Sequence, residues 1–191
     1  MDPFVEKFLN NHRKAMQSPA VMAYSMFTDD KFDIMLNEAL EKTERTAEEK
    51  VIEEEIASAD AAKLVKLMRR KMAAILKFQV QRRLLEKQDE VMAQIKETCV
   101  STMNETFIEN ALFFFAKCEE NPHDWIREEY GNIRSEYFKS MLCVILGIRG
   151  VQRDTMFLIR EAERFEEDFP KELYDQGPYL AVVKLADKYM K

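Results

Sequence analysis

The sequence predicts an all-α protein, a multi-helix bundle of about eight helices with a long central helical hairpin or rod. Its first glycine is Gly131, and no proline stands between Pro19 and Pro122. Interior glycine costs a helix about 1 kcal/mol relative to alanine and interior proline about 3 kcal/mol, so residues 20–121 lack both strong helix breakers. The same stretch is rich in Ala, Leu, Met, Glu, Lys and Arg, which favour helix. No strand pattern stands out.

Cap residues mark the helix starts in the first third of the chain. Asp2-Pro3 and Ser18-Pro19 each place a capping side chain before a proline, which suits the first helical position. Thr28-Asp29-Asp30 precedes apolar residues that share one helical face, namely Phe32, Met35, Leu36 and Ala39. Residues 46–49, Thr-Ala-Glu-Glu, have the form of a capping box.

Residues 60–120 predict either one long helix or two. At about 100° per residue, the apolar arc of residues 64–76 and that of residues 84–99 lie on opposite sides of a helix. The helix therefore either breaks between about residues 77 and 90 or offers different faces to different neighbours. Charged residues interrupt the best heptad seam, so two antiparallel helices are favoured over a coiled coil.

Glycine and proline punctuate the last third of the chain. Asn121-Pro122 opens a helix, and Gly131-Asn132 closes it and starts the next. Gly147 and Gly150 bracket a turn, Pro170 ends a helix at Phe169, and Gly177-Pro178 opens the last helix. We expect one helical domain over 1–191, with N-terminal helices in 1–57, the hairpin or rod in 58–120 and a C-terminal subdomain in 121–191. The apolar runs 112–116 and 141–146 predict two central core helices.

A block of positive charge interrupts an acidic chain. The protein has 35 acidic and 29 basic side chains, a formal net charge of −6, yet residues 61–85 carry bases and no acid. These bases form a candidate surface for nucleic acid or an acidic partner: Lys63, Lys66, Arg69, Arg70, Lys71, Lys77, Arg82 and Arg83. Counted as a helix, the block is basic and amphipathic. It could contact phosphates, lie on a membrane surface or in a partner's groove, or be balanced inside the molecule by residues 48–55, where Glu48, Glu49, Glu53, Glu54 and Glu55 stand.

The sequence holds little that resembles a catalytic or metal site. Glu120 and His123 have the Glu-x-x-His spacing of carboxylate-bridged di-iron bundles, but the other histidine, His12, lacks a matching glutamate. Pro122 suggests a helix start there, so His123 is expected at the surface or as a capping residue. The three cysteines, at 99, 118 and 143, form no paired motif, and no glycine-rich loop is present to hold phosphates. We expect no enzyme activity, no metal and no cofactor.

These observations lead to a non-catalytic function. We expect a helical adaptor or scaffold that mediates protein–protein interaction and that could also bind a second copy of itself. A candidate apolar partner surface consists of Met22, Met26, Phe27 and Met35. The alternative is an RNA-binding protein that uses residues 63–83 as its phosphate-contacting helix. No signal peptide and no apolar run long enough for a membrane span are present, so we expect no integral membrane association and a cytoplasmic location, with the nucleus as an alternative.

Overall fold

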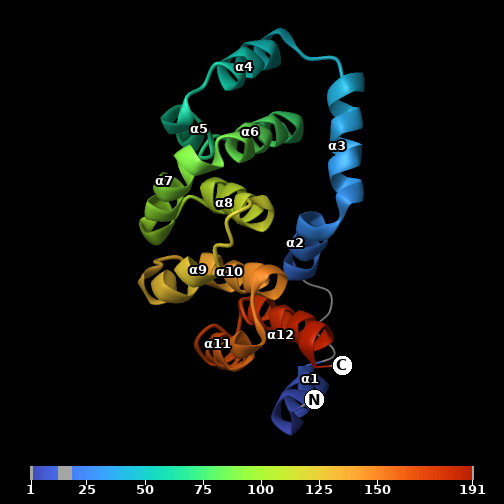
Figure 1. Ribbon diagram of the computed structural model, residues 1–191, viewed down its shortest axis with the longest axis vertical. Helices are drawn as coiled ribbons and strands as arrows, with labels where there is room; N and C mark the ends of the chain where they lie inside the picture. Colours follow the sequence, from blue (N-terminus) through green and yellow to red (C-terminus); the bar gives the residue numbers. More distant parts are fainter. Residues whose placement is uncertain (1, 13–18, 191) are drawn as a thin grey trace. The chain divides into compact units, whose positions relative to one another are not determined.

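The computed structural model describes residues 2–12 and 19–190, and it confirms an all-α protein (Figure 1). Helix makes up 79% of the structure, and the described residues form no strand. They form twelve α-helices rather than about eight. The bounds are α1 (Pro3–His12), α2 (Pro19–Thr28), α3 (Asp30–Lys42), α4 (Ala47–Ala57), α5 (Ala61–Leu67), α6 (Ala74–Glu86), α7 (Gln88–Ser101), α8 (Glu105–Lys117), α9 (His123–Glu129), α10 (Glu136–Arg149), α11 (Thr155–Asp168) and α12 (Gln176–Tyr189), with 3-10 segments η2 (Tyr130–Asn132) and η3 (Gln152–Asp154). Among the described helices, none combines the length and the apolar composition that crossing a membrane requires.

The predicted helix starts near the N-terminus are confirmed by their cap hydrogen bonds. The Phe4 amide donates to Asp2 Oδ1 at 2.8 Å, and Asp29 Oδ1 accepts from the amide of Lys31, the second residue of α3, at 2.9 Å. The capping box of α4 is complete, because Thr46 and Glu49 exchange side-chain and backbone hydrogen bonds. Pro19 is the first residue of α2. Its predicted cap, Ser18, lies outside the described residues, as does the side chain of Phe32.

The chain divides into two compact units that are not contiguous in sequence. Unit 1 comprises residues 1–28 and 121–191, and unit 2 comprises residues 29–120, in each case over the residues that the structure describes. Helices α1 and α2 therefore pack with the C-terminal third of the chain. A single domain over 1–191 stays a prediction.

In unit 1, α12 packs against α10 and α11, and α2 rests on α10 and α12 (Figure 1). The crossing of α10 and α12 is close because small residues meet there. A Cβ at Gly147 would lie 2.9 Å from the Cα of Ala181, and one at Gly177 would lie 2.1 Å from the carbonyl oxygen of Ser140. Gly147 is thus a packing residue inside α10, and the turn predicted between Gly147 and Gly150 begins only at Gly150.

The other boundaries of the C-terminal third follow the sequence with small shifts. α9 begins at His123, directly after the predicted opening at Asn121-Pro122, and the His123 amide donates to Asn121 Oδ1 at 3.1 Å. Residues 130–132 form η2, but the next helix starts later than predicted, at Glu136, where Ser135 caps it. α11 ends at Asp168 before Pro170, and α12 begins at Gln176.

In unit 2, residues 61–117 form four helices, α5 to α8, and the long central hairpin or rod is not confirmed. One break, at Lys87, falls in the interval predicted from the swing of the apolar face. The breaks at residues 68–73 and 102–104 were not predicted. All three occur without glycine, so breaker residues alone were a poor guide to helix length here.

A buried amide explains the break after α5. Asn110, on α8, donates to the carbonyl oxygen of Met68 at 2.8 Å and to that of Thr106 at 2.9 Å. Gln81, on α6, donates in turn to the Asn110 carbonyl and side-chain oxygens, both at 3.0 Å. The Met68 carbonyl at the end of α5 is therefore satisfied by α8 rather than by a continuing helix.

The two apolar runs form core helices, one in each unit. α8 buries most of its side chains, including Phe114 and Phe115, in unit 2. α10 buries residues 140–147 in unit 1. A helix that is apolar over so wide an arc packs on more than one side, as the sequence indicates.

Candidate functional site

The predicted basic surface does not lie on one amphipathic helix. α5 ends at Leu67 and α6 begins at Ala74, so the expected stripe over residues 63–83 is divided between two helices and the segment that joins them. Every one of the eight bases is exposed or half-buried, as a contact surface requires: Lys63, Lys66, Arg69, Arg70, Lys71, Lys77, Arg82 and Arg83.

Several of these bases have partners within unit 2. Glu55, on α4, lies 3.0 Å from the Lys63 ammonium and 3.0 Å from the Arg70 guanidinium. The hydrogen bond from Lys63, with the nearby charge of Arg70, lowers the pKa of Glu55. Lys77 pairs with Glu109 at 3.6 Å. Of the five glutamates at 48–55 that were predicted to neutralise the basic block, only Glu55 forms ion pairs with it. The neutralisation of the block by this segment is therefore incomplete.

The remaining bases divide into two groups. Arg83 pairs with Glu86 on its own helix, and the Arg69 guanidinium carbon lies 5.3 Å from the centroid of the Phe107 ring. By contrast, the side chains of three exposed bases make no ion pair or hydrogen bond with any described residue; they are Lys66, Lys71 and Arg82.

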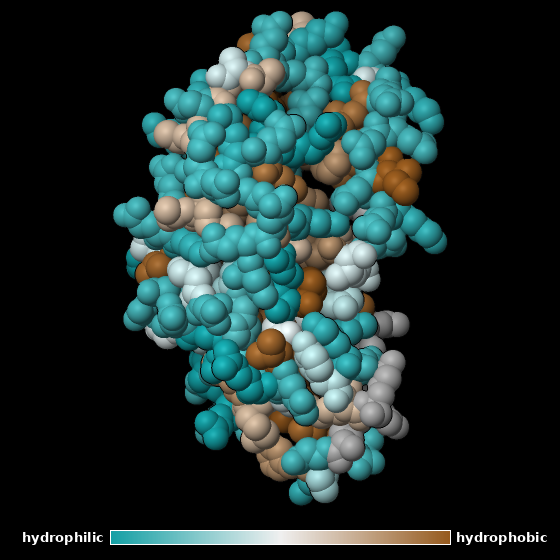
Figure 2. All heavy atoms as spheres, in the orientation of Figure 1, coloured by the Kyte–Doolittle hydropathy of each residue, from teal (hydrophilic) through white to brown (hydrophobic). Residues whose placement is uncertain are grey.

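The predicted apolar partner surface is partly exposed. Met22 and Met26, four residues apart on α2, are exposed in unit 1, and Met35 on α3 is exposed in unit 2. Phe27 is buried, so it contributes to packing rather than to an exposed surface. Sequence reasoning passed over Ile34, next to Met35, which is exposed as well. Figure 2 shows hydrophobic side chains at the surface over α3.

All three cysteines are buried and free of disulfides. Burial raises the pKa of Cys99 well above its ordinary value. Burial also raises the pKa of Cys143 to about 12, although a hydrogen bond with Tyr130 acts the other way. Thiols held protonated in this way are poor nucleophiles, so neither Cys99 nor Cys143 suits covalent catalysis.

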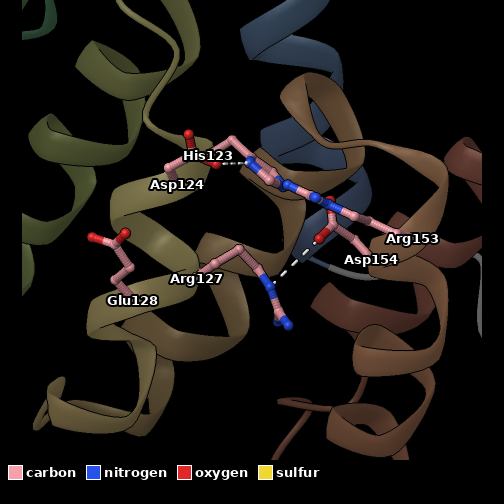
Figure 3. Close-up of a pocket in the computed structure, with 6 residues that line it drawn as sticks. All are labelled: His123, Asp124, Arg127, Glu128, Arg153 and Asp154. Carbon is pink, nitrogen blue, oxygen red and sulfur yellow. Dashed lines mark hydrogen bonds and ion pairs between the residues drawn. The ribbon is translucent and has the colours of Figure 1, made fainter.

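A cluster of ionisable side chains in unit 1 lines a pocket of about 270 Å³ (Figure 3). One lining residue is His123, the first residue of α9; the sequence predicted a surface or capping residue, and the surface position is wrong because His123 is buried. The pocket is lined by His123, Asp124, Arg127, Glu128, Arg153 and Asp154. A larger hollow of about 710 Å³ shares His123, Asp124 and Arg153 with it.

The His123 ring is held between two carboxylates. Its Nε2 atom lies 2.8 Å from Asp154 Oδ2, and its Nδ1 atom lies 2.8 Å from Asp124 Oδ1. An ionised carboxylate can only accept a hydrogen bond. Both contacts are therefore hydrogen bonds at the same time only when each nitrogen of the imidazole carries a proton. Neither ring nitrogen is then left to take a proton from a substrate. The pocket lining also includes no Ser, Thr or Cys, so it provides no nucleophile with a base.

Asp154 organises this pocket. Its Oδ2 atom also accepts the Val151 amide at 2.9 Å, which closes the turn of η3, and its Oδ1 atom lies 3.5 Å from Arg127 Nε. The guanidinium carbon of Arg127 lies 3.6 Å from the centroid of the Phe157 ring, on α11. Asp154 therefore ties the η3 turn to two side chains of α9.

The described residues offer little to a metal ion. No three His, Cys, Asp or Glu side chains among them come together as a ligand set. Glu120 pairs with Lys96 and belongs to unit 2, and the side chain of His12 lies outside the description.

Sequence reasoning did not single out Asp154. It stands 31 residues from His123 along the chain, and no motif links the two positions. The available signal was its place three residues after Val151, where a carboxylate can accept a hydrogen bond from the amide at the start of a short turn. Comparisons of this chain with protein-family models, with curated proteins and with solved structures give no match.

Proposed function

We propose that this chain is a non-catalytic helical adaptor or scaffold that presents apolar helical faces to protein partners. The observation that carries the proposal is the state of α3. This 13-residue helix has no buried side chain among those described, while Ile34 is 58% exposed and Met35 is 60% exposed. Exposed large apolar side chains next to each other on a surface helix are typical of contact sites.

The packing of α3 supports the same proposal. Its half-buried residues share one side of the helix by helical count; they are Asp33, Leu36, Ala39 and Leu40. α3 packs against α6, and Asp33 pairs with Lys117 of α8 at 2.9 Å. Ile34 and Met35 project away from the centre of that side at about 100° per residue. α3 is also fixed at its end, since Arg45 donates to the Leu40 carbonyl and to Glu53 of α4. A helix that is anchored but only half covered can offer its free side to a partner.

The chemistry of unit 1 is in keeping with a non-catalytic function. His123 has both ring nitrogens on carboxylates, and Cys143, the cysteine of this unit, is buried. A protein that binds partners needs none of these groups to react.

A photo-crosslinking experiment tests the proposal. A benzophenone amino acid replaces Met35 in one variant and Glu97 in another, because Glu97 is an exposed residue of a different helix, α7, in the same unit. We expect discrete adducts of higher mass from position 35, absent from position 97 and lost when Ile34→Lys is added. Adducts of twice the chain mass would identify a second copy as the partner. No adduct, or the same adducts at both positions, would contradict the proposal.

The alternative, RNA binding, is favoured by one observation: three exposed bases, Lys66, Lys71 and Arg82, have no partner among the described residues. A fluorescence-anisotropy titration with short single-stranded RNA at about 50 and about 200 mM salt tests it, because phosphate contacts weaken steeply over that range. Micromolar or tighter, salt-sensitive binding that Lys66→Gln and Lys71→Gln abolish would replace the adaptor proposal. Loss of binding only in Lys63→Gln would contradict this use of the unpaired bases.

A further inference from the structure

Two arginines of unit 1, Arg127 and Arg153, line the pocket around His123, and each has guanidinium N–H groups that make no hydrogen bond with the described residues. Arg127 uses Nε toward Asp154, and its two terminal nitrogens have no hydrogen bond or ion pair with any described residue. Arg153 is exposed, and its side chain makes no such contact with the described chain. In Figure 3 Arg153 extends from η3 toward the His123 ring, and Arg127 extends from α9 with its Nε atom facing Asp154.

Arg127 is fixed in place before any ligand arrives. Its guanidinium carbon lies over the Phe157 ring at 3.6 Å from the centroid, and Asp154 Oδ1 lies 3.5 Å from its Nε atom. Asp154 is itself buried and held by the His123 ring and the Val151 amide. Binding through a guanidinium that is already oriented loses little side-chain entropy, which favours a specific contact.

The acids of the pocket do not occupy these donors. Asp124 and Asp154 contact the His123 ring, and the contact of Asp154 with Arg127 is made at Nε, not at the terminal nitrogens. The Glu128 carboxylate points away from both arginines in Figure 3. The terminal nitrogens of Arg127 and the whole of Arg153 are thus left for an anion.

We propose that this pocket binds a phosphate group, with Arg127 and Arg153 as its donors. Two guanidinium groups that come from different elements can contact different oxygens of a tetrahedral anion, and arginine forks suit phosphate oxygens. The volume of about 270 Å³ leaves room beside a phosphate group for part of the carrier of a phosphate monoester. This inference goes beyond the adaptor proposal and does not rest on it, because α3 and the pocket belong to different units.

Titration of the full chain with inorganic phosphate tests the inference. Binding is followed by calorimetry and by the fluorescence of Trp125, the only tryptophan of the chain, which lies on α9 between His123 and Arg127. We expect saturable binding in the wild type. Arg153→Gln should raise the dissociation constant about tenfold, the size of one lost charge-assisted hydrogen bond. Because Arg153 is exposed, this variant should keep the fold even if Arg127→Met does not.

Arg160→Gln is the matched control. Arg160 is an exposed arginine of α11 in the same unit, so the variant removes the same charge without reaching the pocket. Its dissociation constant should equal that of the wild type. Three results would overturn the inference: no saturable binding at millimolar phosphate, equal losses in Arg153→Gln and Arg160→Gln, or unchanged binding in Arg153→Gln.

The source of the phosphate is then decided with two further probes. A short phosphoserine peptide, compared with its unphosphorylated form, represents a phosphorylated protein partner. Glycerol 3-phosphate represents a free small molecule. Tighter binding of the phosphopeptide than of glycerol 3-phosphate, lost in Arg153→Gln, assigns the pocket to a modified protein, and the reverse order assigns it to a metabolite.

Discussion

Asp154 and Asp124 contact the two nitrogens of one imidazole at the same distance and differ in burial. Each places a carboxylate oxygen 2.8 Å from the His123 ring, but the Asp154 side chain is 2% exposed and that of Asp124 is 83% exposed. We expect Asp154→Ala to lower the free energy of unfolding of unit 1 far more than Asp124→Ala does.

The magnitude follows from the groups that each variant leaves behind. Asp154→Ala removes the partner of His123 Nε2 and of the Val151 amide, and the ring stays buried. A hydrogen bond to a charged group contributes about 1.5–3 kcal/mol and a cap-type bond about 1 kcal/mol, so the loss should be about 3 kcal/mol. Removing one partner of a buried pair has a cost of this size. Asp124→Ala removes an exposed pair, worth less than about 1 kcal/mol.

Urea unfolding followed by the fluorescence of Trp125 reports on unit 1, where this tryptophan lies. Far-ultraviolet circular dichroism at zero urea checks that each variant keeps its helix content. Equal losses for the two variants would refute the reasoning, because burial would then not decide the strength of these contacts. A loss below about 0.5 kcal/mol for Asp154→Ala, the usual size of a surface substitution, would refute it as well.

Two further perturbations test the packing and the electrostatics of unit 1. Partial burial acts to raise the pKa of Glu136, but hydrogen bonds from Lys139 and Arg164 outweigh it and hold that pKa below the ordinary 4.5. Because the folded-state pKa is the lower one, this carboxylate stabilises the fold above about pH 4.5 and loses that contribution as the pH falls through its folded-state pKa. Arg164→Gln should flatten the decline of the unfolding free energy on the acid side, and an unchanged decline would count against the assignment. Gly177→Ala should lower the unfolding free energy by about 1–3 kcal/mol, since its Cβ would meet the Ser140 carbonyl oxygen at 2.1 Å. Gly131→Ala, with nothing within 4 Å of the added methyl group, is the control, and similar losses in both would show that the α10–α12 crossing relaxes.

The fold class and the helix starts could be predicted from the sequence because they depend on neighbouring residues. Asp29 and the capping box at Thr46 act within three residues of themselves, so a local pattern identifies them. The break after α5 depends instead on Asn110, which lies 42 residues from the Met68 carbonyl that it contacts. The hydrophobic pattern of residues 63–83 contains no information about that contact. The pattern therefore predicted a continuous helix through residues 68–73, where the helix breaks.

The candidate pocket was beyond prediction for the same reason. His123 and Arg127 share one face of α9 at a spacing of four residues, which a helical count can find. Asp154 joins them only because the turn after α10 returns the chain to the start of α9, and Asn121, just before α9, donates to the Arg149 carbonyl at 3.1 Å. Polar residues that appear isolated along a chain can thus form one cluster once a turn is fixed.

In the folded protein, acids from other helices neutralise part of the positive charge of the basic block, residues 61–85. Residues 61–85 carry no acid, yet α4 and α8 bring Glu55 and Glu109 beside Lys63, Arg70 and Lys77. These pairs are partly exposed, so each contributes little to stability, but each reduces the positive field that a phosphate backbone would meet. The field that remains comes chiefly from the bases without partners. A contact surface in this unit should therefore depend on individual unpaired side chains and on the apolar side of α3, and not on the summed charge of the block.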